Sequence, residues 1–185
     1  MAAVRRLFAL ALVCLASLSA AQQWDHLAAA RILGPHWTKL SHSAGMVFAG
    51  TVLTVEAQPA AKDQPLPIIQ VKFRVDRAIA GVQQGQVLTI REWAGVWSSH
   101  RAMRSGQRIL LFLFPPSRLG LTSPVGGPLG QIALDSRGEI VAAPNSAPAN
   151  EVGNARPPTR QAAAQPGITL RQLERAIRSA RKDKE

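Results

Sequence analysis

The segment Ile69–Asp76 reads IQVKFRVD, and it is the strongest local signal of the fold class in the 185-residue chain. Apolar Ile, Val and Phe residues alternate in it with polar and charged ones. Successive side chains of a β-strand point to opposite faces of the sheet, so a period of two predicts an antiparallel strand with one buried and one solvated face.

Other apolar or β-branched segments predict further strands on either side of this one. They are Met46–Glu56, Gln86–Glu92, Arg108–Phe114, Leu129–Leu134 and Glu139–Val141. The first is apolar on both faces, which predicts a central strand, and the last two predict a hairpin that turns through residues 136–138. Five or six short strands separated by Gly and Pro turns predict a mainly β domain, either a small barrel or a sandwich.

The chain divides into five zones by composition. These are a signal peptide at 1–21, an N-terminal segment at 22–43 with a short helix over Trp24–Leu33, the β domain at 44–141, a Pro/Ala-rich linker at 142–167, and an amphipathic helix with a basic tail at 168–185. The linker has no apolar periodicity, and we expect it to be disordered because it cannot bury enough surface to offset its chain entropy.

The N-terminus carries the pattern of an export signal. Arg5 and Arg6 precede the apolar run Leu7–Leu18, and the small residues Ala20 and Ala21 follow it. This pattern predicts cleavage near Ala20 or Ala21 and export to the periplasm or beyond the cell. A retained anchor and a lipid-modified cysteine are the alternatives. No later stretch is apolar enough to span a membrane.

Cys14 is the only cysteine, and it lies within the apolar run. Its removal with the signal would leave a mature domain that cannot form a disulfide, so the stability of that domain must come from packing.

The C-terminal zone predicts a capped helix. Thr169 and Gln172 form a capping box, and Ile168 and Leu173 can close a hydrophobic staple over it. Leu170, Leu173, Ile177 and Ala180 form one apolar stripe. We expect this stripe to pack against the β domain, with binding to a membrane surface as the alternative.

Several segments together resemble one family. They are Ser43–Val52 (SAGMVFAGTV), Val71–Gly81 (VKFRVDRAIAG) and Ser105–Leu113 (SGQRILLFL), followed by the Gly-rich segment Val125–Gln131 and the helix Thr169–Ile177. In this order they resemble the netrin-like domain, the fold of the tissue inhibitors of metalloproteinases, and more closely an uncharacterised bacterial secreted branch of it. The resemblance implies an OB-like barrel of five strands.

One departure limits what the resemblance implies about function. Inhibitors of that family chelate the catalytic zinc of the protease through a mature N-terminal cysteine held by disulfides. The predicted mature start here is Gln22 or Ala21, so this mechanism does not carry over, and a shared fold does not fix function.

Candidate chemistry outside the resemblance is sparse. His26, His36, His42 and His100 lack the i, i+4 spacing of a helical zinc site, and we expect no metal and no cofactor. Arg91, Trp93, Trp97, Arg101 and Arg104 lie in a predicted loop between two strands, and Trp and Arg are frequent anchors of interaction surfaces. Alternatively, the two tryptophans cover the mouth of the barrel.

These features predict an exported, non-enzymatic binding or accessory module for a protein or cell-envelope partner. One alternative is an envelope hydrolase or metal-dependent enzyme that uses His36, His42 or His100. Another is an electrostatic binder of anionic lipid or cell-wall polymer, since 22 Lys and Arg residues outnumber 11 Asp and Glu residues. Export argues against nucleic acid as the partner.

Overall fold

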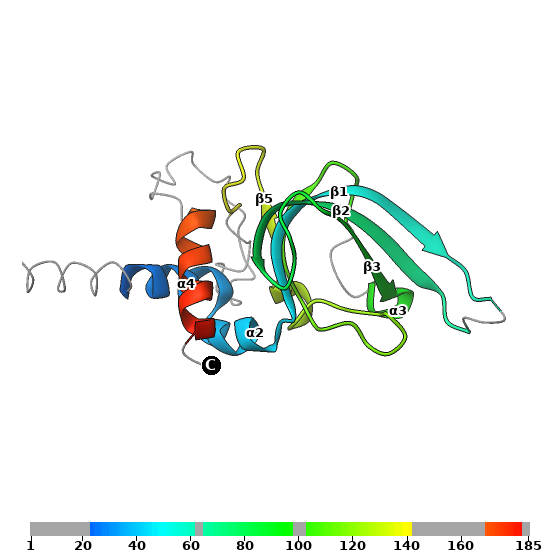
Figure 1. Cartoon of the computed structure of the whole chain (residues 1–185), viewed down its shortest axis with the longest axis horizontal. Coiled ribbons are helices and arrows are strands. Elements are labelled where there is room, and N and C mark those ends of the chain that lie inside the picture. The colour runs from blue at the N-terminus through cyan, green and yellow to red at the C-terminus, as the bar shows by residue number, and fades with distance from the viewer. Residues whose placement is uncertain (1–22, 62–64, 98–102, 142–168, 183–185) are drawn as a thin grey trace, which may run out of the picture.

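A five-stranded antiparallel sheet forms the centre of the molecule (Figure 1). The computed structural model describes residues 23–61, 65–97, 103–141 and 169–182. The strands are β1 (Met46–Gln58), β2 (Ile68–Ala80), β3 (Val87–Trp93), β4 (Arg108–Leu113) and β5 (Gln131–Leu134). Their order is β3-β2-β1-β4-β5, which confirms a mainly β protein with Met46–Gln58 as its central strand.

The sheet is open in its strand pairing. β3 and β5 are its two edges, and no ladder joins them within the described ranges. The predicted strand Glu139–Val141 is reduced to a single bridge between Leu134 and Ile140. β5 starts later than predicted because Gly127–Gly130 forms a 3-10 turn (η1), entered through the positive φ of Gly126.

Two apolar cores lie on opposite faces of this sheet. The core on one face, which we call the second face, is formed by Phe48, Val52, Val71, Phe73, Val75, Ile90, Met103, Ile109, Leu111 and Leu113. The other core lies on the opposite face, which we call the first face, where Leu110 and Phe112 of β4 pack toward the helices. Both faces of β4 are therefore covered, which explains why its sequence is a continuous apolar run rather than an alternating one.

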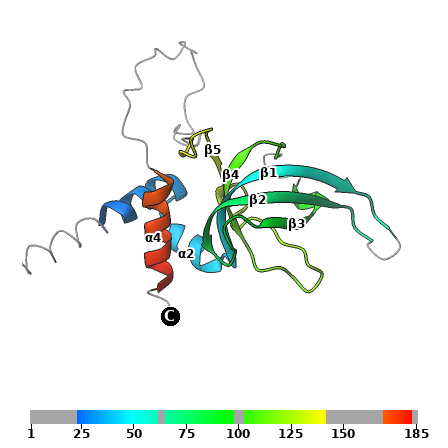
Figure 2. The ribbon, with the colours of Figure 1, turned by 45° about the horizontal axis from the view of Figure 1, so that its top comes forward.

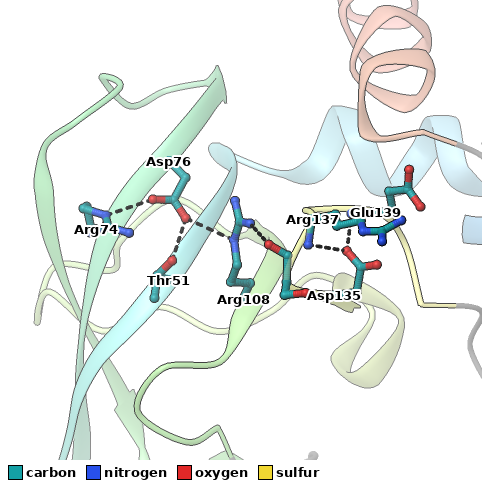
Figure 3. A network of polar contacts seen from close by, with 8 residues as sticks. Thr51, Arg74, Asp76, Arg108, Asp135, Arg137 and Glu139 are labelled. Atoms are coloured by element: carbon teal, nitrogen blue, oxygen red, sulfur yellow. Dashed lines mark hydrogen bonds and ion pairs between the residues drawn. The ribbon is translucent and has the colours of Figure 1, made fainter.

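The solvated face of β2 is organised by one carboxylate (Figure 3). Asp76 accepts hydrogen bonds from Thr51 Oγ1 at 2.6 Å and from Arg74 Nε at 2.9 Å, and Arg108 Nε lies 3.6 Å away. Burial alone would raise the pKa of Asp76, but these hydrogen bonds and the charges of Arg74 and Arg108 outweigh it and hold the pKa below its ordinary value.

Three helices cover the first face at one end of the molecule (Figure 2). They are the helix of residues 23–33, α2 (Trp37–Ser43) and α4 (Leu170–Lys182). The first confirms the predicted short helix and ends before Gly34, whose φ is +83°. The sequence-based prediction contains no counterpart of α2.

The apolar stripe of α4 is buried inside the molecule. Leu173 and Ile177 are fully buried in the same cluster as Ala29, Trp37 and Ile79. The stripe therefore packs on the other two helices as well as on β2, rather than on the sheet alone. The capping box is confirmed, since the Thr169 backbone N–H donates to Gln172 Oε1 at 2.9 Å and the Gln172 N–H donates to Thr169 Oγ1 at 3.3 Å.

Ion pairs and hydrogen bonds fasten α4 in place. Arg175 donates two hydrogen bonds to buried Asp25, at 2.8 and 3.0 Å, and this pairing raises the pKa of Arg175. Glu174 pairs with Arg77 of β2 and with Arg178. The Arg175–Asp25 pair thus joins α4 directly to helix 23–33, although the two helices are far apart in the sequence.

Some predictions fall outside the described residues. The signal peptide, the Pro/Ala-rich linker and the Ile168 side of the staple belong to this group. Within the described ranges, no helix is both long and apolar enough to cross a membrane.

Candidate functional site

A hollow of about 260 Å³ opens at the end of β3. Its lining consists of apolar Trp93, Val96, Phe114, Pro115 and Leu121, the hydroxyl residues Ser117, Thr122 and Ser123, and the carboxyl residue Glu92. The volume lies just below the range of ordinary small-molecule pockets, and an apolar lining with a few polar groups is typical of binding sites.

Backbone hydrogen bonds hold the loop that forms one wall of the hollow. β4 ends at Leu113, Pro115 and Pro116 cannot donate to a strand ladder, and the chain then turns back. The Thr122 N–H donates to the Arg91 carbonyl of β3 at 2.9 Å, and the Phe114 N–H donates to the Ser123 carbonyl at 3.0 Å. The loop is thereby attached to β4 at its base and to the outer edge of β3.

Large apolar side chains remain in contact with solvent at the rim. Trp93 and Phe114 belong to the lining and are 44% and 40% exposed, and Leu119, in the turn of the adjoining loop and outside the lining, is 74% exposed. Exposed aromatic side chains grouped around a hollow are a feature of interaction surfaces rather than of ordinary protein surface.

Among the lining residues that the structure describes, Glu92 contributes the one carboxyl group. It alternates with Leu88 and Ile90 on the inward face of β3, and it is only 1% exposed. Burial disfavours the charged form and raises the pKa of Glu92 from 4.5 to about 7.

The structure separates the predicted binding residues. Arg91 and Trp93 lie on β3 itself and not in a loop, and Trp97 ends a short helix, α3 (Ala94–Trp97), that the sequence did not indicate. Arg104 is exposed in a turn beside β1, outside the lining of the hollow. Arg101 and the side chain of Trp97 lie outside the described residues.

Glu92, Phe114 and the loop 115–123 also belong to the site, although they were not predicted from the sequence. Glu92 carried a usable signal, because an acidic residue there continues an apolar period of two through Leu88 and Ile90. The loop carried none, since its return to β3 depends on a contact distant in sequence.

The histidines are dispersed. His42 donates from Nε2 to the Ala180 carbonyl at 2.8 Å, His26 packs edge-on against Trp37, and His36 is exposed at the start of α2. His100 lies outside the described residues. In the part of the chain that is described, no group of three or more His, Cys, Asp or Glu side chains could hold a metal ion.

Neither models of known protein families nor curated proteins give a match to this chain.

Proposed function

We propose that this protein is an exported, non-enzymatic binding module that holds an apolar group of a protein or cell-envelope partner in the hollow at the end of β3. The observation that carries the proposal is the pair of half-exposed aromatic residues Trp93 and Phe114 in the lining, beside a loop that hydrogen-bonds to β3 and carries exposed Leu119. A fastened apolar rim loses little conformational freedom on binding, so more of the contact energy appears as affinity.

Two of the hydroxyl groups in the lining, those of Thr122 and Ser117, are engaged within the loop. Thr122 Oγ1 donates to the Phe114 carbonyl at 2.6 Å, and Ser117 Oγ accepts from the Leu121 N–H at 3.2 Å. These bonds serve to shape the loop, which favours a binding surface over a nucleophilic site.

We further propose that the body is an OB-like barrel of the netrin-like type. Four strands direct side chains into the second core, and the bond from Thr122 to Arg91 brings the chain after β4 to the free edge of β3. Two glycines of the motifs also pack too tightly for a side chain. A Cβ atom on Gly50 would lie 2.7 Å from the Arg74 carbonyl oxygen, and one on Gly81 would lie 2.1 Å from that of Gly45.

Site-specific photo-crosslinking tests the binding proposal. A benzophenone amino acid replaces exposed Leu119 on the loop beside the hollow or, as a matched control, Val87, which is 63% exposed at the opposite end of β3. In cells that export the protein, we expect a discrete adduct from position 119 that disappears in the Phe114→Ala background. Equal adducts from both positions, or an adduct insensitive to Phe114→Ala, would contradict the proposal.

An acid–base enzyme is a second candidate, and the raised pKa of Glu92 in the hollow is the observation that favours it. A hydrolase screen against cell-envelope substrates distinguishes the two functions. Turnover that is abolished by Glu92→Gln would establish the enzyme, whereas the binding proposal expects no turnover and an unchanged Leu119 adduct in that variant.

A further inference from the structure

The helical end of the molecule carries an exposed basic stripe, of which two residues also help to hold α4 in place. Arg171, Arg175, Arg178 and Lys182 follow one another at intervals of four, three and four residues along α4, and all four are exposed. At 3.6 residues per turn these intervals place them on one face. The opposite face holds the buried residues Leu173 and Ile177.

Exposed apolar side chains lie on the neighbouring helix. Trp24 is 70% exposed and Leu27 is 56% exposed, and their spacing of three places them on one side of helix 23–33. Arg175 forms its two hydrogen bonds with Asp25, the sequence neighbour of Trp24. The Asp25–Arg175 pair therefore brings the basic stripe next to exposed Trp24. Both views show helix 23–33 and α4 side by side, at the end of the molecule opposite to the end toward which β1 and β2 extend (Figures 1 and 2).

The charge of this end is strongly positive. Helix 23–33 and residues 169–182 together contain six basic and two acidic residues, a net charge of +4. Each acidic residue is already paired, Asp25 with Arg175 and Glu174 with Arg77 and Arg178. Arg171 and Lys182 form no ion pair within the described residues, so their charges are directed to solvent.

We propose that this helical face, formed by Trp24, Leu27, Arg171, Arg175, Arg178 and Lys182, binds the surface of a bilayer that contains anionic phospholipid. Trp is the side chain best suited to the headgroup region, because it has an apolar ring and a polar N–H. Basic residues beside it are attracted to anionic headgroups, and the two terms together give peripheral attachment. This helical face and the hollow lie at different ends of the molecule. A partner could therefore bind in the hollow while the helical face contacts the bilayer.

Vesicle co-sedimentation of the purified chain tests the proposal. The probes are vesicles of phosphatidylcholine alone and vesicles of phosphatidylcholine with phosphatidylglycerol at about 7:3. We expect binding to the anionic vesicles only, and we expect it to weaken strongly with added salt because the charges are at the surface. Equal binding to both vesicles, or binding to neither, would overturn the proposal.

Matched charge variants localise the effect. The double variant Arg171→Gln with Lys182→Gln removes two charges from the helical face without breaking any of the ion pairs that hold α4 in place. Its partition coefficient should fall about 30-fold, since each basic residue near the surface contributes a factor of about five. Arg104→Gln with Arg118→Gln removes the same charge from exposed loops of the sheet. It should bind within about two-fold of wild type, and equal losses in both double variants would overturn the localisation.

Trp24→Ala separates a bilayer from a soluble polyanion. Insertion of the indole into the headgroup region predicts a loss of about ten-fold, because its apolar area is returned to water. Quenching of tryptophan fluorescence by brominated lipid should also be larger in wild type than in Trp24→Phe. If Trp24→Ala binds like wild type while the charge variant does not, the partner is an anionic polymer or headgroup alone, and the bilayer proposal fails. Unchanged circular dichroism in every variant confirms that the fold is intact.

Discussion

Replacing Glu92 by Gln should remove a distinctive pH dependence from the stability of the protein. The folded state keeps the Glu92 proton up to a pKa of about 7, while the unfolded chain releases it near 4.5. Between these values the folded state holds more protons than the unfolded state. The stabilising contribution of the proton is therefore fully present below pH 4.5 and is lost as pH rises through 7.

The magnitude follows from the same pKa difference. Each pH unit between the two values corresponds to 1.36 kcal/mol, so the free energy of unfolding should fall by about 3 kcal/mol from pH 4.5 to pH 7. Glu92 is only 1% exposed, so solvent screens this contribution little.

Urea denaturation at a series of pH values measures this effect. The difference between wild type and Glu92→Gln isolates the contribution of Glu92, because Gln has nearly the same shape and does not titrate. We expect the stability advantage of wild type over Glu92→Gln to shrink as pH rises from 4.5 to 7. A difference independent of pH across that window would show that burial does not raise the pKa of Glu92.

Three other substitutions test the packing. Gly81→Ala should lower the free energy of unfolding by more than about 3 kcal/mol, because φ is +68° and the new Cβ would lie 2.1 Å from the Gly45 carbonyl oxygen. The control Gly85→Ala, at φ +82° with open space around it, should lower it by only about 1–2 kcal/mol. Thermal unfolding measures both. Ile177→Ala should lower the free energy of unfolding by about 2–5 kcal/mol, because Ile177 is fully buried between the helices and the sheet. The control Leu27→Ala, at an exposed position, should change it by no more than about 0.5 kcal/mol. Equal effects would show that α4 is not docked. Asp76→Asn should cost about 1–3 kcal/mol at pH 7, since it weakens hydrogen bonds to a charged acceptor. Because the folded pKa of Asp76 is lowered, wild type should also lose more stability than this variant as pH falls below 3.8, and parallel acid denaturation curves would count against that assignment.

Local patterns predicted the strands because each strand's environment is recorded in its own residues. The alternation of Ile69–Asp76 reflects one core face and one solvated face, and the unbroken run at Arg108–Phe114 reflects two cores. The cap of α4 was equally readable, since Thr169 and Gln172 are only three residues apart.

Features that depend on distant contacts could not be predicted in the same way. α2 has no side-chain cap, and it is held by packing against α4, more than a hundred residues away. The hollow arises because the loop after Pro115 returns to Arg91 of β3. Trp93 could thus be identified as a candidate from its residue type, but its neighbours Phe114 and Thr122 could not.

Titration of indole into the ¹⁵N-labelled protein measures whether the hollow at the end of β3 binds an apolar group. Saturable shifts should occur at the Trp93 indole N–H and at the amides of Ser117 and Leu121, with a dissociation constant in the millimolar range expected of so small a ligand. Phe114→Ala should weaken them while leaving the Trp24 signal unchanged. Shifts absent from the hollow, or concentrated at Trp24, would contradict the claim.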